Sequence, residues 1–181
     1  MTSIQRRPRA NYEPEGRDLL RGLDLPSSEP SDGRGEDPAL DRLVNEAVRR
    51  ITRFEAPEAF SATAADGVII DIRSQDAREL HGVIPGSLHI PRTVLEWRIA
   101  LDSPWRNVYL GGLDQQLILI CDHGYSSILA ASNLVHLGFD RAGDVIGGFE
   151  AWRHEGLPIA PCRHRWADGE PLPGLGPPDL G

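Results

Sequence analysis

Short apolar runs that alternate with helical stretches constrain the fold of this chain most strongly. The segments GVIIDIR and QQLILIC are rich in branched aliphatic residues, and each is followed by a turn and then by a helical pattern. DVIGGFEAWRHEG repeats this order, and SLHIP supplies a shorter strand. Strands that alternate with helices predict parallel β-α units, and therefore an α/β fold whose sheet is covered by helices on both faces.

Two helices are expected before the first of these strands. The segment PALDRLVNEAVRRITRF carries apolar side chains at helical spacing from Leu40 to Ile51, and Pro38 suits a first turn. We interpret it as a helix on the flank of the domain rather than as a partner-binding helix. EAPEAFSATAADG is expected to form a second helix that ends at Gly67.

The 181 residues are enough for one domain with extensions at both ends. Residues 1–37 contain the stretch LDLPSSEPSDGRGEDP, which is rich in Pro, Ser, Gly and acidic residues, and are expected to be a flexible leader. Residues 162–181, which end in PLPGLGPPDLG, are expected to be a flexible tail. The domain, including its N-terminal helix, then spans residues 38–161.

Charge and composition exclude several classes of function. The net charge of −8 argues against nucleic acid or an anionic membrane as a partner. All 19 basic residues are arginine, so Schiff-base chemistry and the lysine of a Walker phosphate loop are excluded. No segment has the pattern of a secretory signal or the length of a membrane span. Two cysteines make no disulfide framework, so we expect a cytoplasmic protein.

The first of these cysteines, Cys121, directly follows the most apolar strand and begins the sequence CDHGYSS. Ligands of parallel sheets bind beyond the carboxyl ends of the strands. Gly124 allows the loop to curl, and a helix expected from about Ser126 to Leu137, closed by Gly138, would direct free N–H groups at the same place. Such a cradle of main-chain dipoles is expected to lower the pKa of a neighbouring thiol. We therefore interpret Cys121 as a nucleophile rather than as a buried structural cysteine.

The polar side chains of the loop have simpler interpretations. Asp122 is expected to face solvent or to cap a turn, because a carboxylate beside the sulfur would disfavour a thiolate. His123 is expected to hydrogen-bond the backbone, although it could assist proton transfer. Ser126 and Ser127 suit the capping of a helix, with a hydroxyl contact to a bound anion in addition.

The second cysteine, Cys162, follows the last expected element. We interpret it as a bystander, although it could form a disulfide with Cys121. Cys162 and His164 match no metal-ligand spacing, and no second pair accompanies them, so we predict no metal site.

Several segments together resemble the rhodanese domain family. They are IDIR at residues 70–73, GVIPGSLHIP at 82–91, CDHGYSS at 121–127 and GGFEAWRHEGLP at 147–158. Their order and approximate spacing are those of the family, and the resemblance covers about residues 50–161. It implies an α/β fold with a central parallel sheet of five strands flanked by helices.

The resemblance also implies a function for Cys121, the sulfur-accepting nucleophile of a sulfurtransferase. It would take sulfane sulfur from thiosulfate or a persulfide and pass it, as a persulfide of Cys121, to a thiol, to cyanide or to a protein acceptor, without a cofactor. Asp71 and Arg73 would brace the neighbouring loops as a structural salt bridge, and Gly147 and Gly148 match the approach to the last helix. The active-site loop would bind the substrate, with its residues Asp122, His123, Gly124, Tyr125, Ser126 and Ser127.

The loop departs from many rhodaneses at one position. Many members carry an arginine or lysine at the fifth position after the cysteine, where this chain has Ser126. The loop is similar to the Cys-x-His-Gly-x-Ser-Ser loops of some bacterial single-domain members. The missing cation predicts weak binding of a dianion such as thiosulfate. Arg78, Arg92 and Arg98 are candidate cations from neighbouring loops, although a solvated surface position suits each at least as well.

Two other functions compete with sulfur transfer as interpretations of the loop. Phosphatases and arsenate reductases of this fold have a loop one residue longer and an arginine at the sixth position, which here is Ser127. Phosphoryl transfer normally uses such a guanidinium, so the loop argues against a phosphatase. A non-catalytic rhodanese module for redox sensing, sulfur carriage or partner binding stays open as the alternative.

Overall fold

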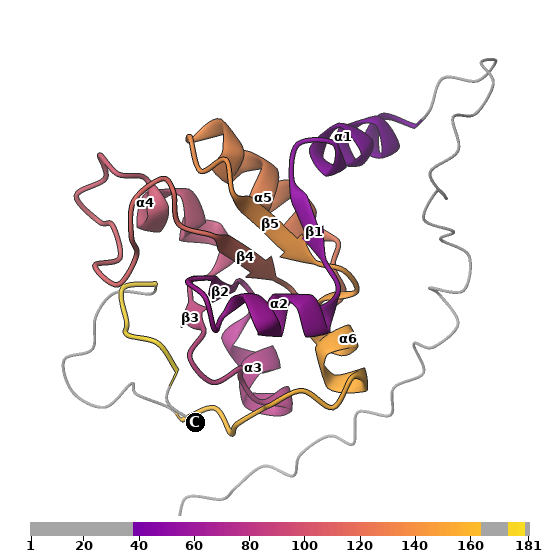
Figure 1. The fold of residues 1–181 in the computed structure, drawn as a ribbon, viewed down its shortest axis with the longest axis vertical. Helices are drawn as coiled ribbons and strands as arrows, with labels where there is room; N and C mark the ends of the chain where they lie inside the picture. Colours follow the sequence, from indigo (N-terminus) through magenta and orange to yellow (C-terminus); the bar gives the residue numbers. More distant parts are fainter. Residues whose placement is uncertain (1–37, 164–173, 180–181) are drawn as a thin grey trace, which may run out of the picture. The chain divides into compact units, whose positions relative to one another are not determined.

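Five parallel strands form the centre of the computed structural model, which describes residues 38–163 and 174–179 (Figure 1). Their order across the sheet is β1-β5-β4-β2-β3, so β4 is the central strand. The predicted α/β fold with a five-stranded parallel sheet is confirmed. The strands are β1 (Thr52–Phe54), β2 (Val68–Asp71), β3 (Leu88–His89), β4 (Leu117–Ile120) and β5 (Ala142–Val145).

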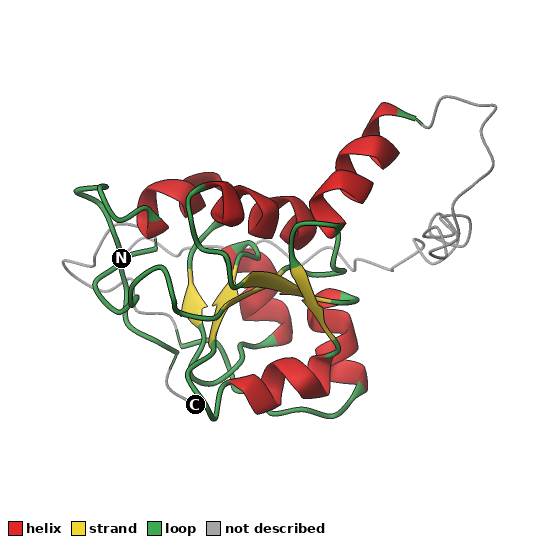
Figure 2. Ribbon diagram, turned by 45° about the horizontal axis from the view of Figure 1, so that its top comes forward, coloured by secondary structure: helices red, strands yellow, loops and turns green. Residues whose placement is uncertain are grey.

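Helices surround the sheet (Figure 2). Among the described residues, no helix combines the length and the apolar character that crossing a bilayer requires. The helices are α1 (Ala39–Val48), α2 (Ala56–Ala62), α3 (Gln75–His81), the 3-10 turn η1 (Arg92–Val94), α4 (Leu95–Ile99), α5 (Ser126–His136) and α6 (Gly148–His154).

The central strand β4 separates two apolar cores. Because successive side chains of a strand point to opposite faces, Leu117 and Leu119 pack with α4 and α5, whereas Ile118 and Ile120 pack with α2 and α6. All four residues are fully buried, as expected for a strand covered on both sides. Packing on both faces holds β4 in place, and Cys121 directly follows its last residue.

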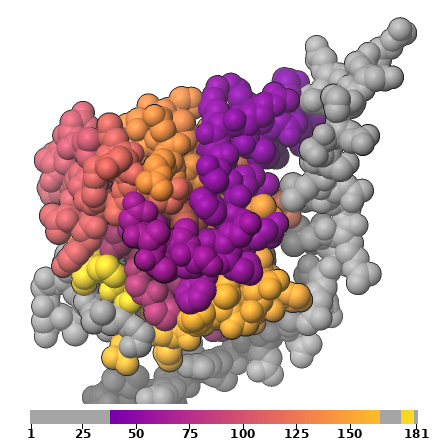
Figure 3. Space-filling model, viewed as in Figure 1, coloured from indigo at the N-terminus to yellow at the C-terminus, as the bar shows by residue number. Residues whose placement is uncertain are grey.

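The N-terminal helix is shorter than predicted. It ends at Val48, and Thr52–Phe54 leave the helical pattern to pair with Gly143–Val145 as the edge strand β1. The expectation of one helix through ITRF was therefore wrong, because hydrogen bonding to β5 overrides a helical spacing that is only a local preference. In the space-filling view, the segment from α1 to α2 (indigo to purple) lies beside the orange segments of α5 and β5 (Figure 3).

The second helix also stops early. α2 ends at Ala62, and a turn leads to Gly67, whose N–H donates to the Ala62 carbonyl oxygen at 3.0 Å. A Cβ at Gly67 would lie 2.9 Å from that oxygen, so the position requires glycine.

Part of the expected tail contacts the domain. The N–H of Gly86 donates to the Asp179 carbonyl oxygen at 2.7 Å, and the N–H of Asp179 donates to the Ser87 carbonyl oxygen at 2.8 Å. Asn107 Nδ2 donates to the carbonyl oxygen of Gly174 at 2.9 Å. Residues 174–179 therefore bind the domain, whereas the expected leader, residues 1–37, lies outside the described residues.

Candidate active site

Cys121 lies where β4 ends, at the carboxyl edge of the sheet. Gly124 turns the following loop at φ +81°, and its N–H donates to Cys121 Sγ at 3.1 Å. α5 begins at Ser126, so the loop and the first turn of this helix fold around the sulfur. The N-cap is Tyr125, without a side-chain cap hydrogen bond, so the capping role expected of Ser126 and Ser127 was wrong. Only 6% of Cys121 is exposed.

The surroundings of the sulfur favour its ionised form. Burial alone would raise the pKa of the Cys121 thiol. The hydroxyl groups of Ser126 and Ser127, together with backbone N–H groups of Ser127 and His123, outweigh this effect and hold the pKa below its ordinary value. A lowered pKa increases the fraction of thiolate, which is the nucleophilic form of a cysteine.

The first residues of α6 hold the cysteine loop in place through backbone hydrogen bonds. The N–H of Phe149 donates to the Cys121 carbonyl oxygen at 2.8 Å, and the N–H of Glu150 donates to the Asp122 carbonyl oxygen at 3.0 Å. A Cβ at Gly148 would lie 2.4 Å from the Cys121 carbonyl oxygen and 2.6 Å from the Gly124 nitrogen. Only glycine therefore permits this approach of two backbones, which holds the loop in the shape that directs the Gly124 N–H at the sulfur.

Two residues that the sequence did not indicate as part of the site, Asp144 and Arg53, are connected to the cysteine through Ser127. Ser127 Oγ lies 3.3 Å from Cys121 Sγ and donates to Asp144 Oδ2 at 3.3 Å. Arg53 Nε donates to Asp144 Oδ1 at 2.9 Å. Burial raises the pKa of Asp144, while Arg53 and the Ser127 hydroxyl partly offset that rise. The one signal in the sequence is an aspartate in the otherwise small and apolar strand AGDV.

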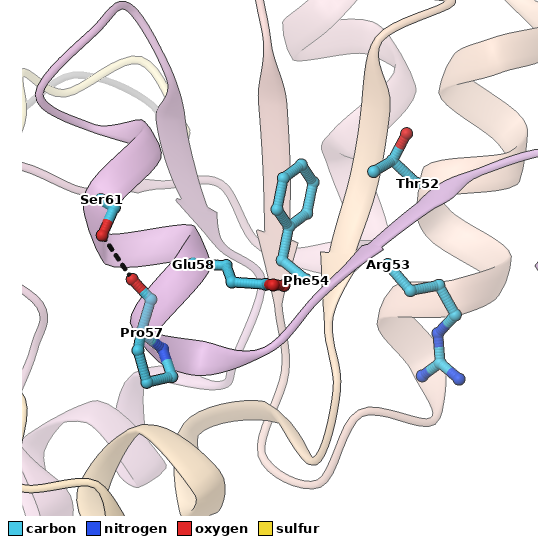
Figure 4. A pocket seen from close by; sticks show the side chains of 6 residues that line it. All are labelled: Thr52, Arg53, Phe54, Pro57, Glu58 and Ser61. Atoms are coloured by element: carbon cyan, nitrogen blue, oxygen red, sulfur yellow. Dashed lines mark hydrogen bonds between the residues drawn. The ribbon is translucent and has the colours of Figure 1, made fainter.

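Arg53 reaches Asp144 because of its place on the edge strand. Thr52, Arg53 and Phe54 line an open pocket of about 540 Å³ together with α2, and Figure 4 shows the Arg53 guanidinium pointing away from Phe54 and from Glu58. Arg53 pairs in register with Asp144 on β5, so the two side chains share one face of the sheet.

Asp71 and Arg73 lie at the end of β2, beside β4. Both are buried, and Arg73 donates to Asp71 from Nε at 2.9 Å and from Nη2 at 2.7 Å. Arg73 also donates to the Gly82 carbonyl oxygen at 2.9 Å, and its guanidinium lies 3.5 Å over the centre of the Phe149 ring. This ion pair therefore links β2 to α6, the helix that supports the cysteine loop.

The three candidate cations have partners of their own. Arg78 donates to Asp179 Oδ2 at 2.6 Å, and Arg92 donates to Glu96 Oε1 at 2.9 Å. Arg98 is buried and donates to a backbone carbonyl oxygen at 3.2 Å. Arg78 and Arg98 are buried, so the solvated surface position considered for these two was wrong. Arg78 and Arg92 are bound to carboxylates, and a role for any of the three in binding substrate stays a prediction.

The remaining side chains of the loop differ in exposure. His123, Tyr125 and Ser126 are exposed, and Asp122 is half-buried.

Cys162, the second cysteine, contacts α3. It is a free thiol, as is Cys121, and Gln75 Nε2 donates to its Sγ at 3.6 Å. Within residues 38–163 and 174–179, no group of three His, Cys, Asp or Glu side chains could hold a metal ion.

Comparison with known proteins places these features in a family. A family model described as the rhodanese-like domain matches residues 56–155. The chain is 37% identical over 102 residues to the thiosulfate sulfurtransferase GlpE of Stutzerimonas stutzeri strain A1501, covering 56% of this chain and 84% of that protein. It is 35% identical over 99 residues to the same enzyme of Pseudomonas syringae pv. syringae strain B728a, covering 54% and 83%.

Solved structures give the same result for the fold. The chain is 30% identical to RPA3614 from Rhodopseudomonas palustris CGA009, described as a possible tyrosine phosphatase of unknown function, with a TM-score of 0.63 over 71% of this chain and 99% of that one. The polysulfide-sulfur transferase of Wolinella succinogenes is 21% identical, with a TM-score of 0.55 over 71% and 91%, and indicates a shared fold.

Proposed function

The chain belongs to the family of rhodanese-like domains, and from this premise we propose that it is a sulfurtransferase that works through a persulfide of Cys121. The observation that carries the proposal is the 3.1 Å hydrogen bond from the Gly124 N–H to a thiol whose pKa is lowered. Two free cysteines suit a reducing compartment, so we expect the enzyme to act in the cytoplasm.

In the first step, the Cys121 thiolate attacks the sulfane sulfur of the donor. With thiosulfate, a new S–S bond forms to Sγ while the S–S bond of the donor breaks, and the electron pair leaves with sulfite. With a persulfide donor, a thiolate leaves instead. The Gly124 N–H, already directed at the sulfur, is suited to stabilise the negative charge at the site.

In the second step, a thiophilic acceptor such as cyanide or a thiol attacks the outer sulfur of the persulfide. The Sγ–S bond breaks, and its electron pair returns to Cys121 as the thiolate. A leaving group with a lowered pKa departs more readily, so the hydrogen bonds that favour attack in the first step also favour release in the second.

A phosphatase is the competing activity of this fold, and RPA3614 is described as a possible one. The loop of this chain, residues 122–127, contains no arginine or lysine. Phosphoryl transfer spreads negative charge over three oxygens and usually needs a guanidinium or a metal ion to stabilise it. The loop therefore supports sulfur transfer over phosphate hydrolysis.

The proposal is tested with thiosulfate or glutathione persulfide as donor and cyanide as acceptor. Wild type should produce thiocyanate with each turnover, Cys162→Ser should do the same, and Cys121→Ser should produce none above the uncatalysed rate. Thiocyanate formation by Cys121→Ser at the wild-type rate would rule out the proposed nucleophile.

A further inference from the structure

The hydroxyl group of Ser127 lies between two acceptors. Its Oγ is 3.3 Å from Cys121 Sγ and 3.3 Å from Asp144 Oδ2. Ser127 and Asp144 are fully buried. A serine hydroxyl has one proton, so it can donate to the sulfur or to the carboxylate, but not to both.

The two ionisation states of Cys121 require different hydrogen bonds. In the thiol, S–H donates to Ser127 Oγ, and the hydroxyl donates to Asp144. When the thiol loses its proton to solvent, the sulfur becomes an acceptor, and the hydroxyl must rotate from Asp144 to Sγ. Among the described residues, the donors that Asp144 then keeps are those of Arg53, Nε at 2.9 Å and Nη2 at 3.4 Å.

We infer that Asp144 is a positioning residue that sets the ionisation of Cys121 by competing for the Ser127 hydroxyl. Asp144 favours the thiol, because ionisation of Cys121 removes the hydrogen bond that the Ser127 hydroxyl donates to this buried carboxylate. Arg53 opposes this effect, because its two donors satisfy the carboxylate when the hydroxyl turns away. We name this chain of hydrogen bonds from Arg53 through Asp144 and Ser127 to Cys121 the serine relay.

The serine relay has a consequence for the reaction that rests on the proposed function. In the persulfide, Sγ carries no charge, and the hydroxyl can return to Asp144. When an acceptor takes the outer sulfur, negative charge appears on Sγ, and the hydroxyl can rotate to meet it. The relay would therefore supply a donor to Cys121 only in the steps where the thiolate attacks or leaves.

The charged groups that we consider around Cys121, apart from Asp144, are paired or screened by solvent, which leaves control of its ionisation to Asp144. Arg53 faces it from β1, while α5 contributes the neutral Ser127. Arg73, which follows the end of β2, is paired with Asp71. In the cysteine loop, Asp122 is half-buried and His123 is exposed, so solvent screens both more than it screens Asp144.

The test measures the rate of alkylation of Cys121 by iodoacetamide against pH, in the full chain with Cys162→Ser so that one thiol reacts. Below the pKa of the thiol, this rate follows the thiolate fraction. Asp144→Asn replaces the charged acceptor with a weaker, neutral amide oxygen, which shifts the hydroxyl towards the sulfur, and should raise the rate roughly tenfold, the value of one hydrogen bond to a charged group. Ser127→Ala and Arg53→Gln should each lower it.

A double-mutant cycle separates the relay from simple charge repulsion. In the Ser127→Ala background, Asp144→Asn and Arg53→Gln should each lose most of their effect. Equal effects in both backgrounds, or a slower reaction of Asp144→Asn, would overturn the inference. Circular dichroism checks folding, and if Asp144→Asn does not fold, Arg53→Gln on the edge strand carries the same cycle.

The alkylation readout does not depend on sulfur transfer. A chain whose alkylation follows the predicted cycle but which takes up no sulfur would keep the relay and refute the proposed function. A chain that transfers sulfur but shows no coupling between Ser127 and Asp144 would refute the relay alone.

Discussion

Gly148→Ala should damage both the stability of the domain and the reactivity of Cys121. The residue has φ +61°, a conformation that costs an L-residue about 1–2 kcal/mol. Its Cβ would meet the Cys121 carbonyl oxygen at 2.4 Å and the Gly124 nitrogen at 2.6 Å, and these are backbone atoms that cannot turn aside. Forcing an extra methyl group into a packed site adds about 1–3 kcal/mol, so the total loss should be about 2–5 kcal/mol.

Gly156→Ala is the matched control, because Gly156 has φ +64° and no atom within 4 Å of the position of a Cβ. It should lose only the conformational cost of about 1–2 kcal/mol. Urea unfolding, followed by tryptophan fluorescence, measures both losses as the free energy of unfolding.

The same two variants separate strain from damage to the site. Gly148→Ala must move the cysteine loop away from α6 and should slow alkylation of Cys121 at least about tenfold, the value of one hydrogen bond to a charged group. Gly156→Ala should react at the wild-type rate. Equal unfolding midpoints for the two variants, with unchanged alkylation in both, would refute the role given to Gly148.

Three further predictions concern substrate binding, pH and the buried ion pair. Ser126→Arg should lower the KM for thiosulfate about tenfold in steady-state assays by adding a charge-assisted contact, whereas Ser126→Gln should not; equal KM values would show that charge does not limit binding. Burial lowers the pKa of His89 below 6.5, so the folded state holds its proton less tightly than the unfolded chain. The neutral His89 side chain therefore supplies stability above pH 6.5 that is lost as pH falls through the folded pKa. His89→Gln should make the urea midpoint fall less steeply with pH over this range, and an unchanged slope would contradict the prediction. Asp71→Asn should lose about 3–5 kcal/mol of unfolding free energy because it leaves the buried Arg73 without its carboxylate, whereas the exposed Glu150→Gln should lose less than about 1 kcal/mol; similar losses would refute the bracing role.

Local sequence patterns predicted most of the fold. Apolar runs located β2, β3, β4 and β5, and the helix expected from Ser126 is α5. The edge strand β1 was missed because it has three residues and continues a helical spacing. Its partners, such as Gly143 for Thr52, lie about ninety residues away in the sequence, where no local pattern can indicate them.

Local sequence patterns also predicted one part of the candidate site and missed another. Cys121 and Gly124 were predicted because one short segment contains the strand end, the turn and the start of the helix. Asp144 and Arg53 were missed because both contacts join segments that are distant in sequence: the register of β1 against β5 brings Arg53 to Asp144, and the packing of α5 beside β5 brings Ser127 to Asp144. A charged residue in a fully buried strand is the signal that could have identified the first of them.

The central claim is that sulfur is carried on Cys121. Mass spectrometry of the intact chain after treatment with thiosulfate or glutathione persulfide tests it most directly, with peptide mapping to locate the change. We predict a gain of one sulfur atom on Cys121 that cyanide removes and that Cys121→Ala never shows. An unchanged mass with every donor, or the same gain in Cys121→Ala, would contradict the account.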